Sequence, residues 1–235
     1  MTNWQSETGK YLPRLDEIYK LIVDKPALPR HIPSPPLSNA PTILQGLIYK
    51  SLSIYSIGVL ERTDETLSAI ICLWKEGFIA EAASLSRLLF EIWGIAYYNT
   101  RALNKYTKNL ELPKLEKVVN KIHEGVRSEV LMPWGTPASE EPIHVMDTLR
   151  ELKKEFPTVM TTYDDLCESA HANQPRYFEW WIIGKYGNNW TNPTVQTRGH
   201  ELLDKTVTSL EFCIKGIKAT SNEGYKICGE LYEHT

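Results

Sequence analysis

Residues 78 to about 100 constrain the fold most, because they are apolar around nearly the whole circumference of a helix. Such a helix is stable only when other elements cover it on most sides. The charges of Glu81, Arg87 and Glu91 make a membrane span costly for this segment. We therefore expect it to be the central helix of a bundle.

Other segments repeat apolar residues at steps of three and four, which is the spacing of one helix face. We predict helices over 11–23, 42–62, 64–76, 114–126, 143–156, 158–170 and 194–219, the last with a weaker helical tail to Tyr232. Asp64 is the expected N-cap of one helix, Gly77 its expected C-terminal turn, and Pro157 separates two others. The predicted fold class is all-α, a single-domain bundle of about seven helices.

Two segments interrupt the helical pattern. Prolines crowd between Pro26 and Pro41, so we divide the chain into an N-terminal helix with a Pro-rich connector (1–41) and a bundle domain (42–235). Residues 172–193 are rich in Trp and Tyr, with Gly and Asn at turn positions. They predict a short hairpin or an irregular loop, either packed on the core or offered as an interface.

Composition excludes some classes of protein. The net charge is −3, whereas a dedicated nucleic-acid-binding protein usually has a strongly basic domain or face. Cys72, Cys167, Cys213 and Cys228 are widely spaced, which favours reduced thiols over a zinc site. The first residues lack the apolar core of a secretory signal, so we expect a cytoplasmic protein.

Residues 101–127 are locally basic, with seven Lys and Arg against three Glu. Two interpretations are open, a solvated lysine face and a phosphate-binding stripe. We favour the solvated face, because no aromatic platform is interleaved with these charges.

Polar residues within the central helix are the candidate site. Ser84, Arg87 and Glu91 stand at i, i+3 and i+7, so they form one polar stripe. Two buried charges need compensation, either by an ion pair that fixes the bundle register or by a pocket that the stripe lines. We combine Arg87 and Glu91 with Tyr163 and His171 as the candidate catalytic residues, with Arg176 nearby. His171 alone is a plausible helix C-terminal cap, but its charge changes near neutral pH.

A metal site is a minor alternative. The pattern Glu-x-x-His occurs at Glu141–His144 and Glu168–His171, and Glu91 is a third carboxylate. Pro142 places the first pair at a helix start, which weakens the required geometry. We assign no metal ligands and expect no cofactor.

Four short motifs carry a resemblance to a family of uncharacterised bacterial helical proteins. They are Gly77-Phe-Ile-Ala-Glu-Ala82, Ser86-Arg-Leu-Leu-Phe-Glu91, Tyr163-Asp-Asp-Leu166 and Ala170-His-Ala-Asn173. They resemble that family's helical hairpin with G-x-x-x-E-A and R-x-L-x-E, followed by a tyrosine–leucine–histidine segment. The resemblance implies an all-α fold and a polar cluster of Arg87, Glu91, Tyr163 and His171, and no particular activity.

The chain is more distantly similar to the helical scaffold of prokaryotic toxin–antitoxin and phage-defence proteins. Their RNases use an Arg-x4–6-His motif, which is absent here, since His171 and Arg176 stand in the reverse order. We expect a self-associating binding or regulatory protein in bacterial stress or phage defence, with a protein partner such as an antitoxin, without nucleic acid or membrane. The alternative is a hydrolase or nuclease-like toxin in which Arg87 and Glu91 anchor the substrate and His171 is the general acid/base.

Overall fold

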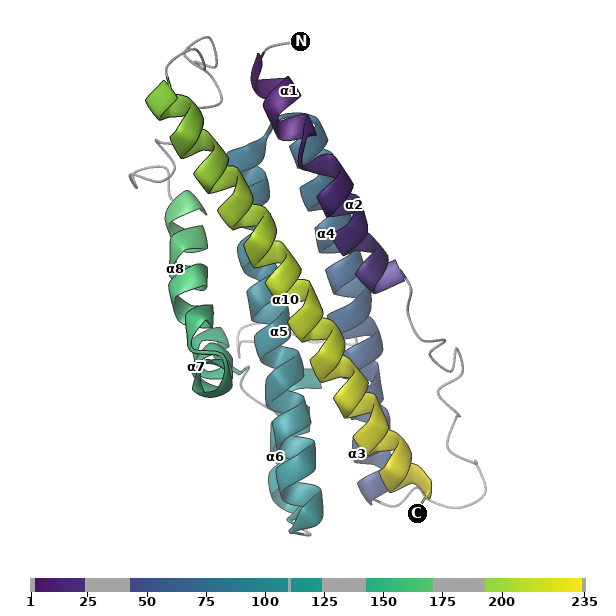
Figure 1. The fold of residues 1–235 in the computed structure, drawn as a ribbon. Helices are drawn as coiled ribbons and strands as arrows, with labels where there is room; N and C mark the ends of the chain where they lie inside the picture. The colour runs from purple at the N-terminus through teal and green to yellow at the C-terminus, as the bar shows by residue number, and fades with distance from the viewer. Residues whose placement is uncertain (1–2, 24–42, 110, 124–142, 171–192, 234–235) are drawn as a thin grey trace, which may run out of the picture. The chain divides into compact units, whose positions relative to one another are not determined.

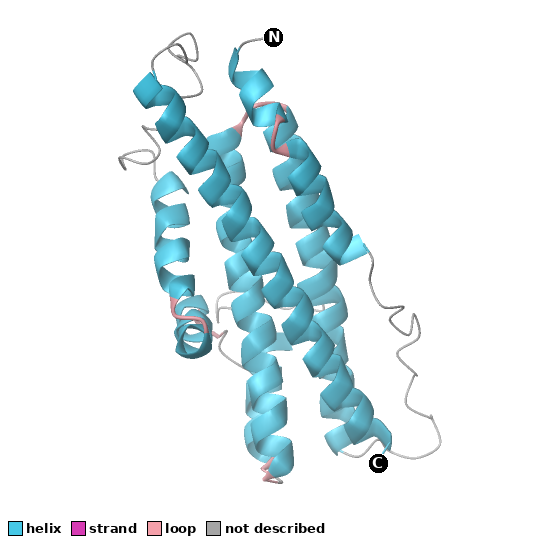
Figure 2. Cartoon of the chain, viewed as in Figure 1, coloured by secondary structure: helices cyan, strands magenta, loops and turns pink. Residues whose placement is uncertain are grey.

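The computed structural model describes residues 3–23, 43–109, 111–123, 143–170 and 193–233. Within these ranges the chain forms helices and short connections, and no described residue lies in a strand (Figure 2). The all-α fold predicted from the periodicity is therefore confirmed. The Pro-rich connector and the aromatic segment 172–193 lie outside the described residues.

The chain divides into two compact units, each gathered from three stretches. The first unit comprises Met1–Lys25, Arg62–Glu91 and Phe156–Gly216, and the second comprises Pro26–Glu61, Ile92–Glu155 and Ile217–Thr235. Two helices contribute residues to both units, α5 (Ile79–Lys108) and α10 (Pro193–Glu233). The division of the chain at residue 41 stays a prediction.

In the first unit, α1 (Asn3–Gly9) and α2 (Leu12–Val23) pack against α4 (Arg62–Lys75) (Figure 1). The inward face of α2 consists of Leu15, Ile18 and Ile22, each no more than 2% exposed. The sequence did not indicate α1, because a helix this short has too few residues for a periodic pattern. The unit is completed by α8 (Thr158–Ala170) and the first parts of α5 and α10.

The expected helix start at Asp64 is wrong. An uninterrupted helix runs over Ile43–Lys75, composed of α3 (Ile43–Ser53), the π-helical segment η1 (Ile54–Glu61) and α4. Wider π turns keep the backbone hydrogen-bonded through the segment, so the chain needs no cap at Asp64. By length and composition this helix resembles a membrane span, but core helices of soluble proteins pass the same test.

Gly77 ends this helix as predicted. Its φ of 85° is in the left-handed region, where a residue without Cβ is favoured. The Gly77 amide donates to the Trp74 carbonyl at 3.1 Å, and the Phe78 amide donates to the Leu73 carbonyl at 2.8 Å. These two bonds form a Schellman motif, which turns the chain into α5.

In the second unit, α3 packs against α6 (Leu112–His123), and Lys50 Nζ donates to Asn120 Oδ1 at 2.8 Å. The unit also contains η1, α7 (Val145–Glu155) and the later parts of α5 and α10. Here α5 continues to Lys108, well past the predicted end near residue 100. The predicted helical tail to Tyr232 is part of α10, which continues to Glu233 as one helix, with Thr220, Ser221 and Cys228 buried along its later part.

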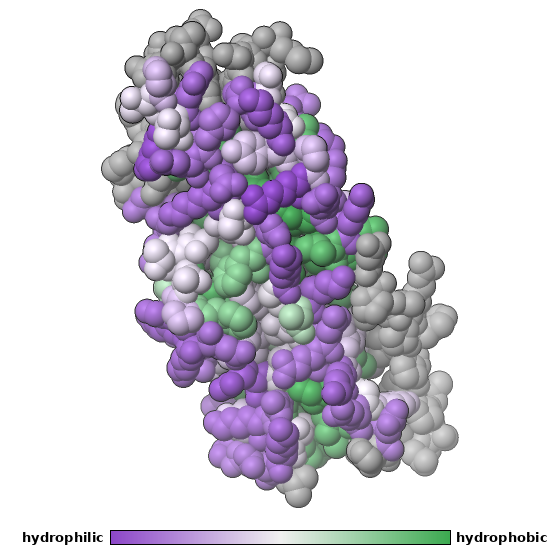
Figure 3. All heavy atoms as spheres, in the orientation of Figure 1, coloured by the Kyte–Doolittle hydropathy of each residue, from purple (hydrophilic) through white to green (hydrophobic). Residues whose placement is uncertain are grey.

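Pro157 separates α7 from α8, as predicted. The four cysteines are free thiols, as predicted, but only Cys213 and Cys228 are buried in the core, since Cys72 is exposed and Cys167 is half-buried. The face of the molecule in Figure 3 is mainly hydrophilic, with smaller hydrophobic areas between the polar side chains. This distribution is ordinary for helices that bury one face and solvate the other.

Candidate functional site

The predicted polar cluster forms in the first unit. Tyr163 on α8 donates its hydroxyl proton to Glu91 Oε1 on α5, at 2.9 Å. Arg87 Nε lies 3.5 Å from the same carboxylate oxygen. The structure therefore brings Arg87, Glu91 and Tyr163 together, and the two charges compensate each other along one helix.

These charges are less buried than expected. The Arg87 side chain is 38% exposed and that of Glu91 is 21% exposed, whereas Tyr163 is buried. The fully buried face of α5 in this region carries Ala83 and Ser86 instead. The apolar residues around the central helix had suggested that Arg87 and Glu91 face the interior of the bundle. In the structure these two side chains lie at the edge of the buried face instead.

Protonation in the cluster follows from this geometry. Burial, together with the hydrogen bond to Glu91, raises the pKa of Tyr163, so the phenol stays protonated and acts as a donor. Burial acts to lower the pKa of Arg87, but Cys167 and the Glu91 charge outweigh it and raise that pKa. The Glu91 oxygen that a general base would use thus already accepts a hydrogen bond from Tyr163 and pairs with the Arg87 charge, while part of the Arg87 side chain reaches solvent.

His171 and Arg176 lie outside the described residues, so their predicted place beside this cluster stays a prediction. The Glu-x-x-His pairs fall partly outside as well, through Glu141 and His171. Among the described residues, no three His, Cys, Asp or Glu side chains gather closely enough to hold a metal ion.

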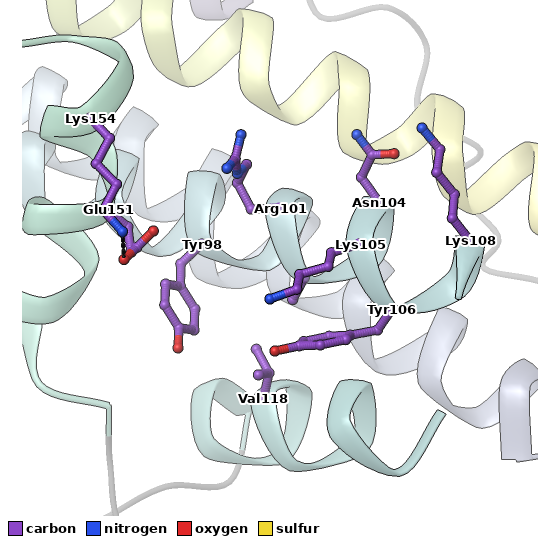
Figure 4. A pocket seen from close by; sticks show the side chains of 10 residues that line it. Tyr98, Arg101, Asn104, Lys105, Tyr106, Lys108, Val118, Glu151 and Lys154 are labelled. Carbon is purple, nitrogen blue, oxygen red and sulfur yellow. Dashed lines mark hydrogen bonds and ion pairs between the residues drawn. The ribbon is translucent and has the colours of Figure 1, made fainter. Parts of the chain in front are cut away.

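A second candidate site is a cavity of about 590 Å³ in the second unit. Its walls come from α5, α6 and α7 (Figure 4). A Cβ on Gly94 of α5 would stand 2.6 Å from Thr148 Oγ1 of α7, so these two helices approach closely only because residue 94 is glycine. That approach sets Glu151 and Lys154, about one and two turns after Thr148, beside α5.

The cavity is strongly basic. Its lining has four basic side chains and one acidic side chain: Arg101, Lys105, Lys108, Lys154 and Glu151. Lys154 pairs with Glu151, but the other three form no ion pair with any described residue. Arg101, Lys105 and Lys108 stand at i, i+4 and i+7, so they lie within about two turns of α5.

Two tyrosines accompany these cations. Figure 4 shows Tyr98, Lys105 and Tyr106 projecting from α5 on the side of α6, while Arg101, Asn104 and Lys108 leave its other edge. Lys105 Nζ lies 5.1 Å from the centroid of the Tyr106 ring. Burial, with smaller contributions from Tyr106 and nearby carboxylates, raises the pKa of Tyr98, which therefore keeps its hydroxyl proton.

The adjacent Tyr97 makes different contacts from Tyr98. Its hydroxyl donates to Glu155 Oε2 at 2.8 Å, and its ring centroid lies 5.8 Å from the Arg101 guanidinium carbon. Burial and this hydrogen bond raise the pKa of Tyr97 to about 12. The Arg101 guanidinium thus lies over the ring of Tyr97, which is not among the residues that line the cavity.

Sequence reasoning missed this cavity for an identifiable reason. It ended the central helix near residue 100, which separated Tyr98 from Arg101 and Lys105. In the continuous helix these residues stand at i, i+3 and i+7 and share one face. The statement that no aromatic side chain accompanies the basic segment is therefore wrong, since Tyr98 and Tyr106 line the same cavity.

Comparisons with protein-family models, with curated proteins and with solved structures found no match to this chain.

Proposed function

We propose that the protein is a cytoplasmic binding or regulatory protein whose second unit binds a phosphate-bearing anion. One observation carries the proposal: Arg101, Lys105 and Lys108 line one cavity and form no ion pair with a described residue. Several positive side chains around one cavity attract an anion to it. The chain as a whole has a net charge of −3, so the positive charge at this cavity is opposite in sign to the net charge of the protein.

The size of the cavity agrees with a ligand-binding role. Pockets for small molecules usually have volumes of roughly 300–1,000 Å³, and this one, which is open to solvent on one side, has about 590 Å³. Arginine and lysine are the usual phosphate-binding side chains, arginine through its planar fork and lysine as a point charge. The protonated hydroxyl of Tyr98 adds a neutral donor.

Titration calorimetry with tripolyphosphate tests the proposal. We expect saturable binding at one site, weakened about tenfold or more when Arg101→Gln and Lys105→Gln are combined, because each removes a charged donor. The matched control is Lys153→Gln, which removes one exposed charge from α7 next to the cavity-lining Lys154. Absence of binding at millimolar tripolyphosphate, or equal affinity in all variants, would refute the proposal.

The proposed place in bacterial stress or phage defence is supported by the motif resemblance described above. A protein partner, for example an antitoxin, belongs to the same proposal. Pull-down of the full chain with the product of a neighbouring open reading frame tests it, and the expected result is a stoichiometric complex. Failure of every adjacent gene product to bind would count against it.

The alternative proposal is a hydrolase or nuclease-like toxin, favoured by the meeting of Arg87, Glu91 and Tyr163. In this case His171 is the general acid/base and Arg87 holds the anionic substrate. Overexpression should then arrest growth, and His171→Ala should restore it with almost no change in melting temperature. Tyr163→Phe, which removes the hydrogen bond to Glu91 and keeps the ring, tests the contribution of the cluster separately from that of His171. Growth arrest that persists in His171→Ala would eliminate the toxin mechanism.

A further inference from the structure

We infer that the ligand of the second-unit cavity is a nucleotide, with its phosphates on the basic side chains of α5 that line the cavity and its base against Tyr98. This inference rests on the proposed anion-binding function and names the rest of the ligand. It follows from the space, the rings and the spacing of the lining residues.

The space exceeds what phosphate needs. A phosphate group occupies only a few times the volume of a water molecule, which is about 30 Å³. The cavity of about 590 Å³ therefore leaves most of its volume for the remainder of the ligand. That remainder meets Ala102 and Val118 as well as the polar residues, so part of it is apolar.

The rings favour a planar group. Tyr106 has one cation, Lys105, over its ring, and its side chain extends toward Val118 of α6 (Figure 4). The Tyr98 ring stands in the cavity between this pair and Glu151. Nucleobases stack on such aromatic faces whatever their identity, since every base has a π-face. Glu151 supplies an acceptor for the amino or hydroxyl groups that a nucleoside carries.

The spacing of the lining residues along α5 indicates where the base and the phosphates of the ligand would lie. Along a helix axis, Tyr98 precedes Arg101 and Lys105 by about 5 and 10 Å respectively. A nucleoside di- or triphosphate has its base and its outer phosphates separated by a sugar, which is a separation of this order. The same helix thus offers a ring at one end of the cavity and cations toward the other.

Titration calorimetry of the full-length chain with ATP, tripolyphosphate and adenosine separates the nucleotide inference from the anion-binding proposal. We expect ATP to bind about tenfold more tightly than tripolyphosphate, because base stacking adds to the charge interactions. Adenosine should bind too weakly to measure. Tyr98→Leu should remove the advantage of ATP and leave tripolyphosphate unchanged, whereas Tyr98→Phe, which keeps the ring, should retain it.

Each other outcome has a distinct meaning. Equal affinities for ATP and tripolyphosphate would overturn the nucleotide inference and leave the anion-binding proposal standing, while binding of neither would overturn both. A single-stranded RNA oligonucleotide that binds more tightly than ATP would overturn the inference in favour of a nucleic-acid ligand. If Tyr98→Leu does not fold, the ratio of the ATP affinity to the tripolyphosphate affinity still decides whether the ligand is a nucleotide. This ratio is measured in the unaltered protein and in Tyr98→Phe.

Discussion

At the scale of single residues, the ring of Tyr55 lies where a side chain on Gly224 would stand. Tyr55 is fully buried, and its hydroxyl is 2.6 Å from Thr100 Oγ1. The Tyr225 ring packs beside it with centroids 5.5 Å apart. Burial raises the pKa of Tyr55, so this phenol is a neutral hydrogen-bonding group in the core of the second unit. Gly224 is therefore the position that lets α10 approach this ring.

Gly224→Ala is expected to lower the free energy of unfolding by about 1–3 kcal/mol, because the added methyl must displace the Tyr55 ring. Gly229→Ala is the matched control on the same helix, since a Cβ there meets nothing within 4 Å. It should raise stability by up to about 1 kcal/mol through helix propensity. Urea denaturation measures both, and a neutral or stabilising Gly224→Ala would contradict the packing described here.

Residue-scale prediction succeeded where a short-range rule applied. Arg87 and Glu91 are four residues apart on one helix, so their pairing followed from spacing alone. Tyr163 was grouped with them as a candidate pocket residue, and the motif resemblance implied the same cluster, but no spacing rule connects α5 with α8. The degree of exposure of Arg87 was not predictable, because it depends on which helices cover that row of α5.

At the scale of helices, Arg14 connects α2 with α10 inside the first unit. Its guanidinium lies 3.0 Å from Asp204 Oδ1, 2.9 Å from Glu211 Oε2 and 3.1 Å from Thr208 Oγ1. Hydrogen bonds from Lys215 and Arg14 lower the pKa of Glu211 below its usual 4.5. The contacts are partly exposed, so their contribution to stability is modest.

Arg14→Gln should cost about 1 kcal/mol of unfolding free energy at pH 7. Because the pKa of Glu211 is lowered on folding, its stabilisation is complete above pH 4.5 and is lost as the pH falls through the lowered value. The difference between protein and variant should therefore shrink in acid. Arg150→Gln, whose partner Asp147 lies in the same helix, is the control and should cost less at pH 7. A difference that grows in acid would contradict this account.

Helix ends marked by Gly77 and Pro157 were predictable, since these residues act through their own backbone chemistry. The π-helical segment η1 was not, because no residue type signals wider turns and the pattern of apolar residues continues through it. The late end of α5 was missed for a related reason, and the last part of α10 was predicted only as a weaker helical tail to Tyr232. Polar residues such as Asn99, Thr100 and Thr220 are buried there, which conceals the apolar period.

At the scale of the whole molecule, we predict self-association, on the basis of the aromatic content of 10% and the long helix α10. Light scattering should give a mass of at least twice 27.0 kDa at micromolar concentration. Dilution should shift the mass downward if the association is reversible. A mass of one chain over the whole concentration range would contradict the prediction.

The grouping into two units has a consequence for synthesis of the protein. Each unit contains part of α10, so the first unit is complete only once Gly216 has been synthesised, and the second only once the remainder of α10 has followed. The growing chain therefore carries the two parts of α5 before the α10 segments of their units exist. Such nascent chains are typical clients of chaperones, and a premature stop codon before Gly216 would leave both units incomplete at once.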